Sequence, residues 1–272
     1  MNYRHSFHAG NFADLVKHAL LLWLLERTQA NGPATVIDTH AGAGLYDLTG
    51  DAARSREAEA GIARLVAAAD RPPLIEALAN EVAALNPAGG ARFYPGSPLL
   101  IARRLRADDR YVGFELNPPV LSLLAEALAP FPEAMAEGGD GYDQAVEWAG
   151  RASGPFVLID PPFEQPDDYL RAADAGAAIV RADARATVAI WTPLKDMETF
   201  DGFLRRLASA GAGRVLVAEA RLRSLNNPMK MNGCAMVVLN PPMGSEEAAR
   251  EICAWVVETL GETGGRAEVW AP

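Results

Sequence analysis

Cysteine is almost absent from the sequence, and so are the features of exported and membrane proteins. The 272 residues include only Cys234 and Cys253, with no Cys-x-x-Cys pair, so neither a disulfide framework nor a thiolate zinc site is expected. The longest apolar run, Ala19 to Leu25, is much shorter than the ~18 residues that a membrane span needs. Polar residues follow Met1, which argues against a signal peptide. These absences predict a cytoplasmic protein with no membrane partner.

Positive charge is also in short supply. The 25 lysines and arginines are outnumbered by 35 acidic residues, and the formal net charge is -10. A protein this acidic has no general attraction for nucleic acid, so a polyanionic partner must meet a local basic patch. The basic residues that could form one are Arg221, Arg223 and Lys230 in one loop, and Arg103, Arg104, Arg106 and Arg110 in a second cluster. The second cluster fits an exposed helix face equally well.

Short apolar segments recur along the chain with helical patterns between them, which predicts an α/β fold. The expected strands cover residues 34–38, 111–115, 135–137, 156–159, 187–191, 213–218 and 234–239. This order fits a Rossmann-like sheet of seven strands, the class I methyltransferase variant, in which the last strand is antiparallel to the others. Residues 246–260 would then form a terminal amphipathic helix. The whole chain, residues 1–272, is expected to be a single domain.

The spacing between the first two strands is too long for an ordinary doubly wound fold. An acid that binds a ribose normally follows the glycine loop by about 20 residues, but strand 111–115 comes much later. Residues 58–69 and 74–85 have helical apolar spacing, and residues 86–90 would end the second helix. We therefore expect a small helical insertion over about residues 50–92. It could grip the substrate or simply connect the two strands.

The segment Asp38-Thr39-His40-Ala41-Gly42-Ala43-Gly44 directly follows the first expected strand. Glycines at alternate positions just past a parallel strand let a ligand approach the backbone, as nucleotide-like cofactors do. The third glycine of the dinucleotide fingerprint is missing, which disfavours a pyrophosphate ligand. Asp38, placed just before the loop, suits a cofactor that carries an amino group. The segment therefore favours S-adenosylmethionine.

Three further residues stand where a nucleoside cofactor would be bound. Ser97, followed by Pro98, is expected to cap a helix that continues to about Leu105, and its hydroxyl could either only cap or also bind a cofactor carboxylate. Glu115 ends the second expected strand and could bind both ribose hydroxyls. Asp140 lies in the sharp turn after the third strand, where an acceptor for an adenine amine is expected.

The apolar strand at residues 156–159 ends abruptly in Asp160-Pro161-Pro162-Phe163. The prolines lack an N–H and stop strand pairing, so the backbone there forms a stiff arch with free carbonyl groups. A carboxylate, a carbonyl and a flat ring can together hold an exocyclic amine while the ring stacks on its base, as enzymes that act on an extruded nucleobase require. On its own, the tetrapeptide fits a proline-rich turn with a capping Asp equally well.

A second segment, Asn240-Pro241-Pro242-Met243, has a similar composition but is expected to be inert. Its strand, 234–239, should be antiparallel, so the segment would lie at the sheet edge opposite the cofactor. Met243 is also a poor stacking platform compared with an aromatic ring. We therefore exclude this segment from the predicted active site.

Residues 1–11 are rich in side chains that bind or stack and poor in core-forming residues, which predicts an ordered N-terminal arm. Asn11 should cap a helix that runs to about Gln29 and carries Lys17 and His18 in its second turn. Two histidines in the arm lack the further ligands that a metal ion needs. No metal site is expected.

Together these motifs resemble those of one protein family. Asp160-Pro161-Pro162-Phe163 resembles the Asp/Asn-Pro-Pro-aromatic motif of amino methyltransferases that modify adenine N6. Residues 3–11, 38–44 and 94–98 together are similar to the corresponding segments of the RlmJ family, which are bacterial adenine-N6 methyltransferases of 23S ribosomal RNA. The likeness runs nearly from end to end and includes the insertion.

The resemblance implies S-adenosylmethionine as the cofactor and 23S ribosomal RNA as the partner. The residues it places in the cofactor site are His18, His40, Ser97, Glu115, Asp140, Gly141 and Asp160, to which we add Lys17, Asp38 and Gly42. The catalytic motif is Asp160, Pro161, Pro162 and Phe163. Within it, Asp160 would face the target amine.

The resemblance also assigns the N-terminal arm to the RNA, with Tyr3, and beside it Arg4 and His5, in contact with the substrate. One position departs from the family pattern, because members carry Tyr where this sequence has Phe163. Stacking on a base survives that change, whereas a hydrogen bond from a tyrosine hydroxyl does not.

Three other functions remain open from the residues alone. A DNA adenine-N6 methyltransferase would share the cofactor and motif residues. A dinucleotide-dependent oxidoreductase would share the glycine loop and Glu115 but would leave Asp160 to Phe163 without a role. A non-catalytic RNA-binding module would explain the arm and the basic loop but not the acids at the strand ends. We expect the protein to act as a monomer.

Overall fold

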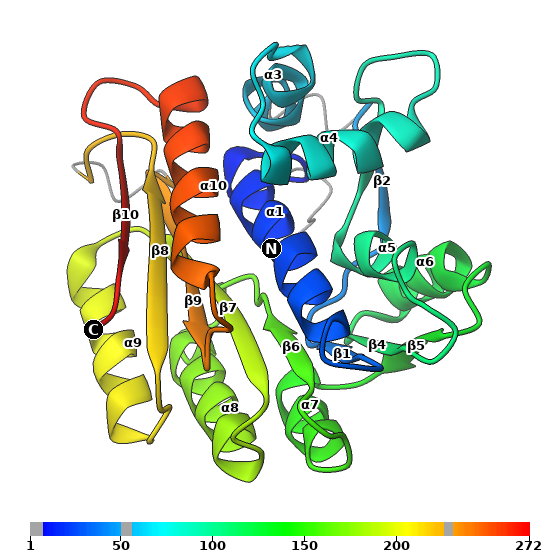
Figure 1. Cartoon of the computed structure of the whole chain (residues 1–272), viewed down its shortest axis with the longest axis vertical. Coiled ribbons are helices and arrows are strands. Elements are labelled where there is room, and N and C mark those ends of the chain that lie inside the picture. Colours follow the sequence, from blue (N-terminus) through cyan, green and yellow to red (C-terminus); the bar gives the residue numbers. More distant parts are fainter. Residues whose placement is uncertain (1–7, 50–55, 226–230) are drawn as a thin grey trace.

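The computed structural model describes residues 8–49, 56–225 and 231–272, and its centre is a sheet of eight strands (Figure 1). In the order in which they lie side by side, the strands are β10 (Arg266–Trp270), β8 (Val215–Arg221), β9 (Gly233–Leu239), β7 (Thr187–Leu194), β6 (Phe156–Ile159), β1 (Thr35–Asp38), β4 (Arg110–Glu115) and β5 (Ala134–Gly138). The five strands from β7 to β5 are parallel, whereas β9 is antiparallel to its neighbours β7 and β8. The α/β class and the antiparallel direction of the last predicted strand are therefore confirmed.

The predicted count of seven strands is wrong, because β10 adds an eighth at one edge of the sheet. It pairs antiparallel with β8, from Arg266 opposite Arg221 to Trp270 opposite Val217. As an edge strand β10 is only half-buried, so its sequence lacks the continuous apolar run of the central strands. It follows the terminal helix α10 (Ser245–Leu260), which the sequence did predict.

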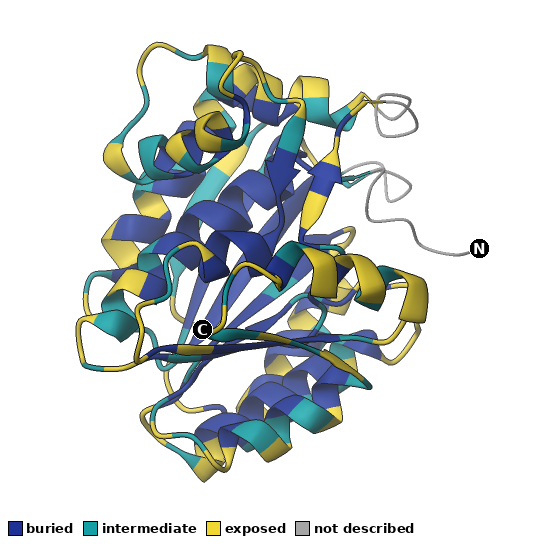
Figure 2. Cartoon of the chain, turned by 90° about the vertical axis from the view of Figure 1, so that its right-hand side faces the viewer, coloured by how far each residue is buried: buried dark blue, intermediate teal, exposed yellow. Residues whose placement is uncertain are grey.

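Helices cover both faces of the sheet, as a buried parallel sheet requires. One face carries α1 (Phe12–Gln29), α4 (Pro73–Leu85), α5 (Ser97–Ala102), α6 (Pro118–Leu128) and α10. The other face carries α7 (Gly141–Ala149), α8 (Asp168–Ala182) and α9 (Met197–Ser209). Figure 2 shows buried strands between helices whose outer sides are exposed. Three of the predicted site residues lie where central strands end: Asp38 ends β1, Glu115 ends β4 and Asp160 follows β6.

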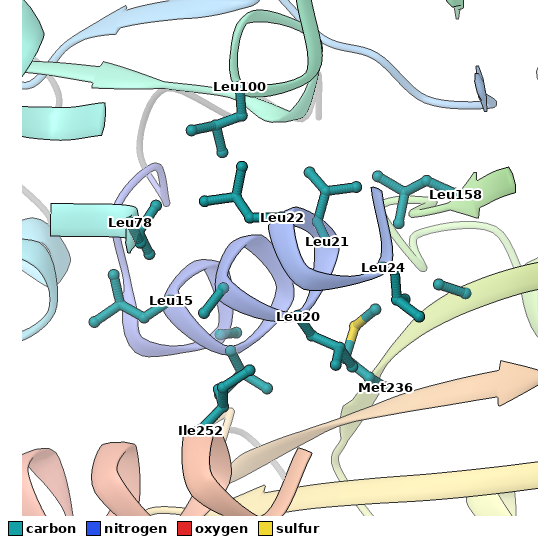
Figure 3. Close-up of a cluster of buried hydrophobic side chains, with 14 of the residues drawn as sticks. Leu15, Leu20, Leu21, Leu22, Leu24, Leu78, Leu100, Leu158, Met236 and Ile252 are labelled. Carbon is teal, nitrogen blue, oxygen red and sulfur yellow. The ribbon is translucent and has the colours of Figure 1, made fainter. Parts of the chain in front are cut away.

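Helix α1, in which 13 of the 18 residues are buried, lies between the sheet, α4 and α10 (Figure 1). Its leucines, among them Leu15, Leu20 and Leu24, are at most 2% exposed, and Figure 3 shows them packed among neighbours such as Leu78 and Ile252. Each buried leucine stabilises the fold by roughly 1.5–3 kcal/mol. Within the described residues, no helix is long and apolar enough to cross a membrane. The burial of α1 instead reflects its central place in the protein.

The ends of α1 follow the prediction. The side-chain oxygen of Asn11 accepts hydrogen bonds from the backbone N–H groups of Ala13 and Asp14, and the helix ends at Gln29. An N-cap of this kind typically contributes ~1 kcal/mol to helix stability. The second turn, with Lys17 and His18, is therefore held at a fixed position against the sheet.

The described residues between β1 and β4 form a separate hairpin and four helices, the last of which is α5. Helices α2 (Glu57–Ala60), α3 (Ile62–Ala67) and α4 lie between the strands β2 (Leu45–Asp47) and β3 (Phe93–Pro95), which pair antiparallel. The first predicted helix, over residues 58–69, is in fact two short helices that break at Gly61. A Cβ atom at Gly61 would lie 2.2 Å from the carbonyl oxygen of Gly10, so close packing against the start of α1 explains this glycine.

The two predicted basic patches are largely neutralised by ion pairs. The pairs are Arg221 with Glu219, Arg223 with Glu262, Arg103 and Arg104 with Glu81, and Arg106 with Asp109. Arg110 donates to backbone carbonyl groups instead, and Lys230 lies outside the described residues. The acidic partners lie either a few residues away from the arginines or in another part of the chain. The acid-free composition of a basic segment therefore did not predict that its arginines would be ion-paired.

Candidate active site

A large cavity, with a volume of about 1660 Å³, opens at the carboxyl ends of the central parallel strands. Its walls include these predicted site residues: Lys17, His18, His40, Gly42, Ser97, Glu115, Asp140, Gly141, Asp160, Pro161, Pro162 and Phe163. Small-molecule sites usually measure ~300–1,000 Å³, so this cavity can hold a nucleoside cofactor together with a second base. The predicted RNA contacts Tyr3, Arg4 and His5 lie outside the described residues.

The glycine loop after β1 is tightly packed. Gly42 and Gly44 have φ values of 66° and 77°, a region that favours glycine. A Cβ atom at Gly42 would lie 2.3 Å from the hydroxyl oxygen of Tyr46. That hydroxyl also accepts a hydrogen bond from the backbone N–H of Ala43 at 3.1 Å. The absence of a side chain at Gly42 thus makes room for the Tyr46 hydroxyl, and both residues lie on the cavity wall.

Asp38 differs from its prediction, because it lies behind the cavity wall and not on it. Its side chain is 0% exposed and accepts hydrogen bonds from the hydroxyl groups of Ser97 at 2.7 Å and Tyr111 at 3.3 Å. Burial raises the pKa of Asp38 to about 6, although the hydrogen bond from Ser97 opposes this shift. Asp38 therefore has no surface with which to bind a cofactor amino group directly, and it supports the wall from behind.

Ser97 also departs from the predicted capping role. Helix α5 begins at Ser97, its N-cap residue is Gly96, and no side chain caps it. The Ser97 hydroxyl donates its proton to Asp38, so it is not free to donate the same proton to a cofactor carboxylate. The helix is also shorter than predicted, since it ends at Ala102.

Glu115 stands at the end of β4 with both carboxylate oxygens engaged but not saturated. Oε2 accepts from the backbone N–H of Gly42 at 3.2 Å, and Oε1 accepts from that of Asn117 at 2.8 Å. Each oxygen of a carboxylate can accept about two hydrogen bonds, which leaves one position on each. Glu115 therefore ties the glycine loop to β4 and still presents two acceptors to the cavity.

Asp140 caps helix α7 and is held by an arginine that the sequence did not point to. The guanidinium of Arg171 lies 2.8 Å from both carboxylate oxygens of Asp140 and over the ring of Tyr142, 4.4 Å from its centre. Burial opposes the charge of Asp140, but the hydrogen bond and charge of Arg171 outweigh it and lower its pKa. Oδ1 also accepts from the backbone N–H of Tyr142, so the open acceptor position is on Oδ2.

Two histidines line the cavity. His40 Nδ1 lies 2.6 Å from the hydroxyl of Thr39, and its ring meets the ring of Tyr142 edge-on. Burial lowers the pKa of His40 to about 4, so it is neutral at pH 7. His18, almost fully buried, lies 2.7 Å from the hydroxyl of Tyr94 and stacks on its ring.

The catalytic-motif residue Asp160 emerges from β6 directly onto Lys17. The Lys17 Nζ atom lies 2.6 Å from Asp160 Oδ2 and 2.7 Å from Asp14 Oδ1. Burial opposes the charge of Lys17, but the two carboxylates outweigh it and raise its pKa, so it stays protonated. Lys17 was predicted to bind the cofactor. In the structure its ammonium group, on the cavity wall, lies between the carboxylates of Asp14 and Asp160. One oxygen of Asp160, Oδ1, accepts no hydrogen bond from the described residues.

Phe163 adopts a backbone conformation that is rare for an aromatic residue. Its φ is 51°, in the left-handed region, and such strain is often retained at functional sites. The ring is 7% exposed and lies 4.4 Å from the ring of Tyr169 and 5.8 Å from that of Trp191, measured between centres. Pro161 is buried and Pro162 exposed. The two prolines thus deliver an aromatic ring to the cavity wall on a rigid support.

The similar segment at residues 240–243 stays outside the cavity, as predicted. Its strand β9 is antiparallel to β7, so the segment leaves the sheet at the opposite edge. The side chain of Asn240 donates to the backbone carbonyls of Ala184 and Ala186, and Met243 is 96% exposed. Its role is structural.

The cavity wall also includes residues that the sequence did not single out: Asp14, Glu57, Arg171 and Trp191. Tyr169, whose ring contacts that of Phe163, was not predicted as a site residue either. Both Asp14 and Arg171 lie within ordinary helix patterns. Asp14 pairs with Lys17 of the same helix, whereas Arg171 of α8 pairs with Asp140, the residue that caps α7. Trp191 lies in a predicted strand and Tyr169 in a predicted helix, where aromatic residues usually form core. No group of three or more residues that could hold a metal ion occurs within the described ranges.

Comparison with known proteins gives one consistent set of relatives. Residues 31–272 match the model of a family described as "Ribosomal RNA large subunit methyltransferase D, RlmJ". Two proteins named Ribosomal RNA large subunit methyltransferase J are similar over nearly the whole chain. The one from Escherichia coli is 33% identical over 267 residues, 97% of this chain and 95% of the relative. The one from Haemophilus influenzae is 32% identical over 264 residues, 96% of this chain and 94% of the relative.

A solved structure, that of protein LPL1258 from Legionella pneumophila, has the same fold. It superposes with a TM-score of 0.85 at 23% sequence identity and covers 97% of this chain and 98% of its own. The likeness in fold therefore extends over nearly the whole of both chains.

Proposed function

We propose that this chain, which belongs to the ribosomal RNA large subunit methyltransferase J family, transfers a methyl group from S-adenosylmethionine to the N6 amine of an adenine in 23S ribosomal RNA. The observation that carries the proposal is the position of Asp160 to Phe163, which share one cavity with the glycine loop and the acids at the ends of β4 and β5. A cofactor and a target base can therefore meet at Asp160.

The cavity wall fits a nucleoside cofactor. Glu115 offers one open acceptor on each oxygen, which suits two ribose hydroxyls, and Asp140 offers one for an adenine amine. Gly42 and Gly141 lie on the cavity wall, and neither has room for a side chain: a Cβ would lie 2.3 Å from the Tyr46 hydroxyl at Gly42 and 1.8 Å from the Thr39 carbonyl oxygen at Gly141. S-adenosylmethionine supplies an electrophilic methyl group on a sulfonium when it is bound.

Asp160 and the carbonyl of Pro161 act on the target amine. Because Lys17 occupies Oδ2, the free oxygen Oδ1 is the one that accepts an N–H of the adenine amine, and the Pro161 carbonyl accepts the other. These two hydrogen bonds direct the nitrogen lone pair at the methyl carbon, so that the N–C bond forms while the C–S bond breaks and sulfur keeps the electron pair. The surplus proton on nitrogen leaves afterwards, to Asp160 or water. Positioning is the chief contribution.

Phe163 holds the target base. An adenine that leaves its stack must be bound firmly enough to offset an unstacking cost of a few kcal/mol, and stacking on an aromatic ring provides about 1–3 kcal/mol per base. Tyr169 and Trp191 support the ring of Phe163, so it keeps its orientation when the base arrives. The rest of the binding energy has to come from the RNA around the target base.

The RNA contacts are proposed at the cavity rim and in the N-terminal arm. The described basic clusters are mostly ion-paired, so they attract RNA less than the sequence suggested. Tyr3, Arg4 and His5 precede His8, which lies on the cavity wall. We also propose a monomer, and a ribosomal RNA substrate implies that it works in the cytoplasm.

The deciding experiment offers the purified protein S-adenosylmethionine with a labelled methyl group and either protein-free 23S RNA or duplex DNA. We expect N6-methyladenosine in the RNA, identified by mass spectrometry after digestion, and no label in the DNA. Methylated DNA with unlabelled RNA would support a DNA methyltransferase instead. Calorimetric titration should detect S-adenosylmethionine but not NAD, and the reverse result would favour an oxidoreductase.

A further inference from the structure

The helical insertion touches the start of α1 through one carboxylate. Glu57, the first residue of α2, lies with Oε1 and Oε2 each 3.0 Å from His8 Nδ1, and Oε2 accepts a hydrogen bond from the Asn11 side-chain amide at 3.0 Å. Asn11 is the residue whose side chain caps α1. A single residue of the insertion therefore holds both the turn before α1 and the cap of that helix.

Close backbone packing reinforces this contact. The N–H of Ile62 donates to the carbonyl of Gly10 at 2.8 Å. A Cβ atom at Gly10 would lie 2.8 Å from Ile62 Cγ2, and one at Gly61 would lie 2.2 Å from the Gly10 carbonyl oxygen. The turn contributes Gly10 and the insertion contributes Gly61 to this contact. The two backbones approach so closely that neither position has room for a side chain.

From the turn, a chain of polar contacts leads to the catalytic motif. Asp14 Oδ2 accepts the backbone N–H of Gly10 at 2.8 Å, and Asp14 Oδ1 lies 2.7 Å from Lys17 Nζ. Lys17 Nζ in turn lies 2.6 Å from Asp160 Oδ2. The segment from Gly10 to Lys17 therefore connects the insertion at one end with Asp160 at the other.

His8 shows that the catalytic loop is close to the same junction. The hydrogen bond with Glu57 raises the pKa of His8 against the effect of burial, and the charges of Glu57, Asp14 and Glu164 act in the same direction. Glu164 directly follows Phe163. The insertion, the first helix and the catalytic loop each contribute a carboxylate around His8, and His8, Glu57 and Glu164 all line the cavity.

We infer that Glu57 is a positioning residue for methyl transfer. It fixes the start of α1 and, through Asp14 and Lys17, the orientation of the Asp160 carboxylate, which gives the insertion a role beyond connecting two strands. This inference rests on the proposed function. The ion pair of Glu57 with His8 is partly exposed and adds little to stability, so the role of Glu57 can be removed without unfolding the protein.

The test compares Glu57→Ala and Glu57→Gln with Glu59→Ala. Glu59 lies in the same four-residue helix, outside the cavity, and its removal changes the net charge equally. We expect Glu57→Ala to lower the single-turnover rate on 23S RNA by about 10-fold or more while the Kd for S-adenosylmethionine stays within about 2-fold, since small displacements of reacting groups cost rate before they cost binding. Glu57→Gln keeps an acceptor for Asn11 and should recover part of the rate, and Glu59→Ala should match the wild type.

Hydrogen–deuterium exchange provides a readout that needs no substrate. The amides of Ala13 and Asp14, bonded to the Asn11 side chain, should exchange faster in Glu57→Ala but not in Glu59→Ala. A wild-type protein that does not methylate RNA would refute the proposed function and leave this measurement intact. The inference is overturned if exchange is unchanged, if Glu57→Ala turns over at the wild-type rate, or if its rate falls only in step with cofactor binding or thermal stability.

Discussion

Lys17 donates a hydrogen bond to Asp160 at an Nζ–Oδ2 distance of 2.6 Å, although 143 positions separate the two residues in the sequence. Lys17 also pairs with Asp14, and none of the three side chains is more than 11% exposed. A buried ammonium between two carboxylates satisfies one oxygen of Asp160, and the other oxygen is the one that we propose binds the target amine. Helix α1, which is largely buried, thus orients the Asp160 carboxylate through Lys17.

Replacing Lys17 with methionine should damage both stability and activity. The change leaves Asp14 and Asp160 close together without a cation, and breaking a buried pair in this way typically costs about 3–5 kcal/mol. We expect urea denaturation to show a loss of that order. The double variant Asp14→Asn/Lys17→Met removes one of the two charges and should recover much of the stability but not the methyl-transfer rate. Recovery of both would show that Lys17 serves the fold alone.

Asp160→Ala should separate binding from chemistry. The variant removes the acceptor of the target amine, while Lys17 keeps Asp14 as its partner and the fold is maintained. We expect methyl transfer to fall by about 100-fold or more, because the lone pair of the amine is no longer directed at the methyl group. Calorimetry should still detect S-adenosylmethionine. Full activity in this variant would contradict the mechanism. Asp160→Asn keeps one acceptor oxygen, so its methyl-transfer rate should lie between those of the wild type and Asp160→Ala.

Phe163 tests whether stacking alone holds the target base. Phe163→Leu keeps an apolar side chain but removes the flat ring, so kcat/KM for RNA should fall by roughly 5- to 100-fold, the range expected for one lost base–aromatic stack. Phe163→Tyr should keep at least the wild-type rate, since it preserves the ring. Cofactor affinity and thermal stability serve as controls in both variants. A leucine variant as active as the wild type would remove Phe163 from the base site.

The central fold was predictable because buried parallel strands such as β6 have continuous apolar sequences, and a polar residue marks the end of the strand. It did not predict β10, because a half-buried edge strand lacks such a run. For the site, it found the residues at strand ends, since parallel strands bring those ends together. It missed the arginine that holds Asp140, because Arg171 lies within a regular amphipathic helix and the contact depends on how α7 and α8 pack.

Ser97 and Lys17 show a second limit of sequence reading. A serine before a proline is a common helix start, yet the hydroxyl of Ser97 bonds to the buried Asp38 and not to the helix. Lys17 was placed near the cofactor by its position in the chain, and the structure gives it two carboxylate partners. Sequence spacing predicts which helix or strand a residue belongs to. It does not predict the hydrogen-bond partner of that residue, which depends on the three-dimensional arrangement of side chains.

Arg171→Gln should weaken cofactor binding. Arg171 contacts both oxygens of Asp140, which lines the cavity, and so fixes the orientation of that carboxylate. Loss of a charge-assisted hydrogen bond of this kind is expected to raise the Kd for S-adenosylmethionine by roughly 10-fold. Arg206→Gln is the matched control, because Arg206 pairs with Asp174 in the same way outside the cavity. Unchanged or tighter binding in Arg171→Gln would show that the arginine competes with the adenine amine for Asp140.

Asp38 should make the stability of the protein depend on pH in a defined direction. Burial raises its pKa from 3.8 to about 6, so between these values the folded protein keeps a proton that the unfolded chain releases. The stability that this group contributes is therefore present below about pH 4, decreases as the pH rises, and is lost above about pH 6, a change of at most about 3 kcal/mol.

The variant Asp38→Asn isolates this contribution, because the asparagine does not titrate and its carbonyl oxygen can still accept from Ser97. The free energy of unfolding of the wild type minus that of the variant should decrease as the pH is raised from about 4 to 7, measured by urea denaturation. His40 has a lowered pKa and acts with the opposite sign, since its stability contribution is lost as the pH falls, but it is present in both proteins and cancels in the difference. A difference that is flat or increases with pH would mean that Asp38 stays ionised in the core, and that Ser97 and Tyr111 compensate for its burial.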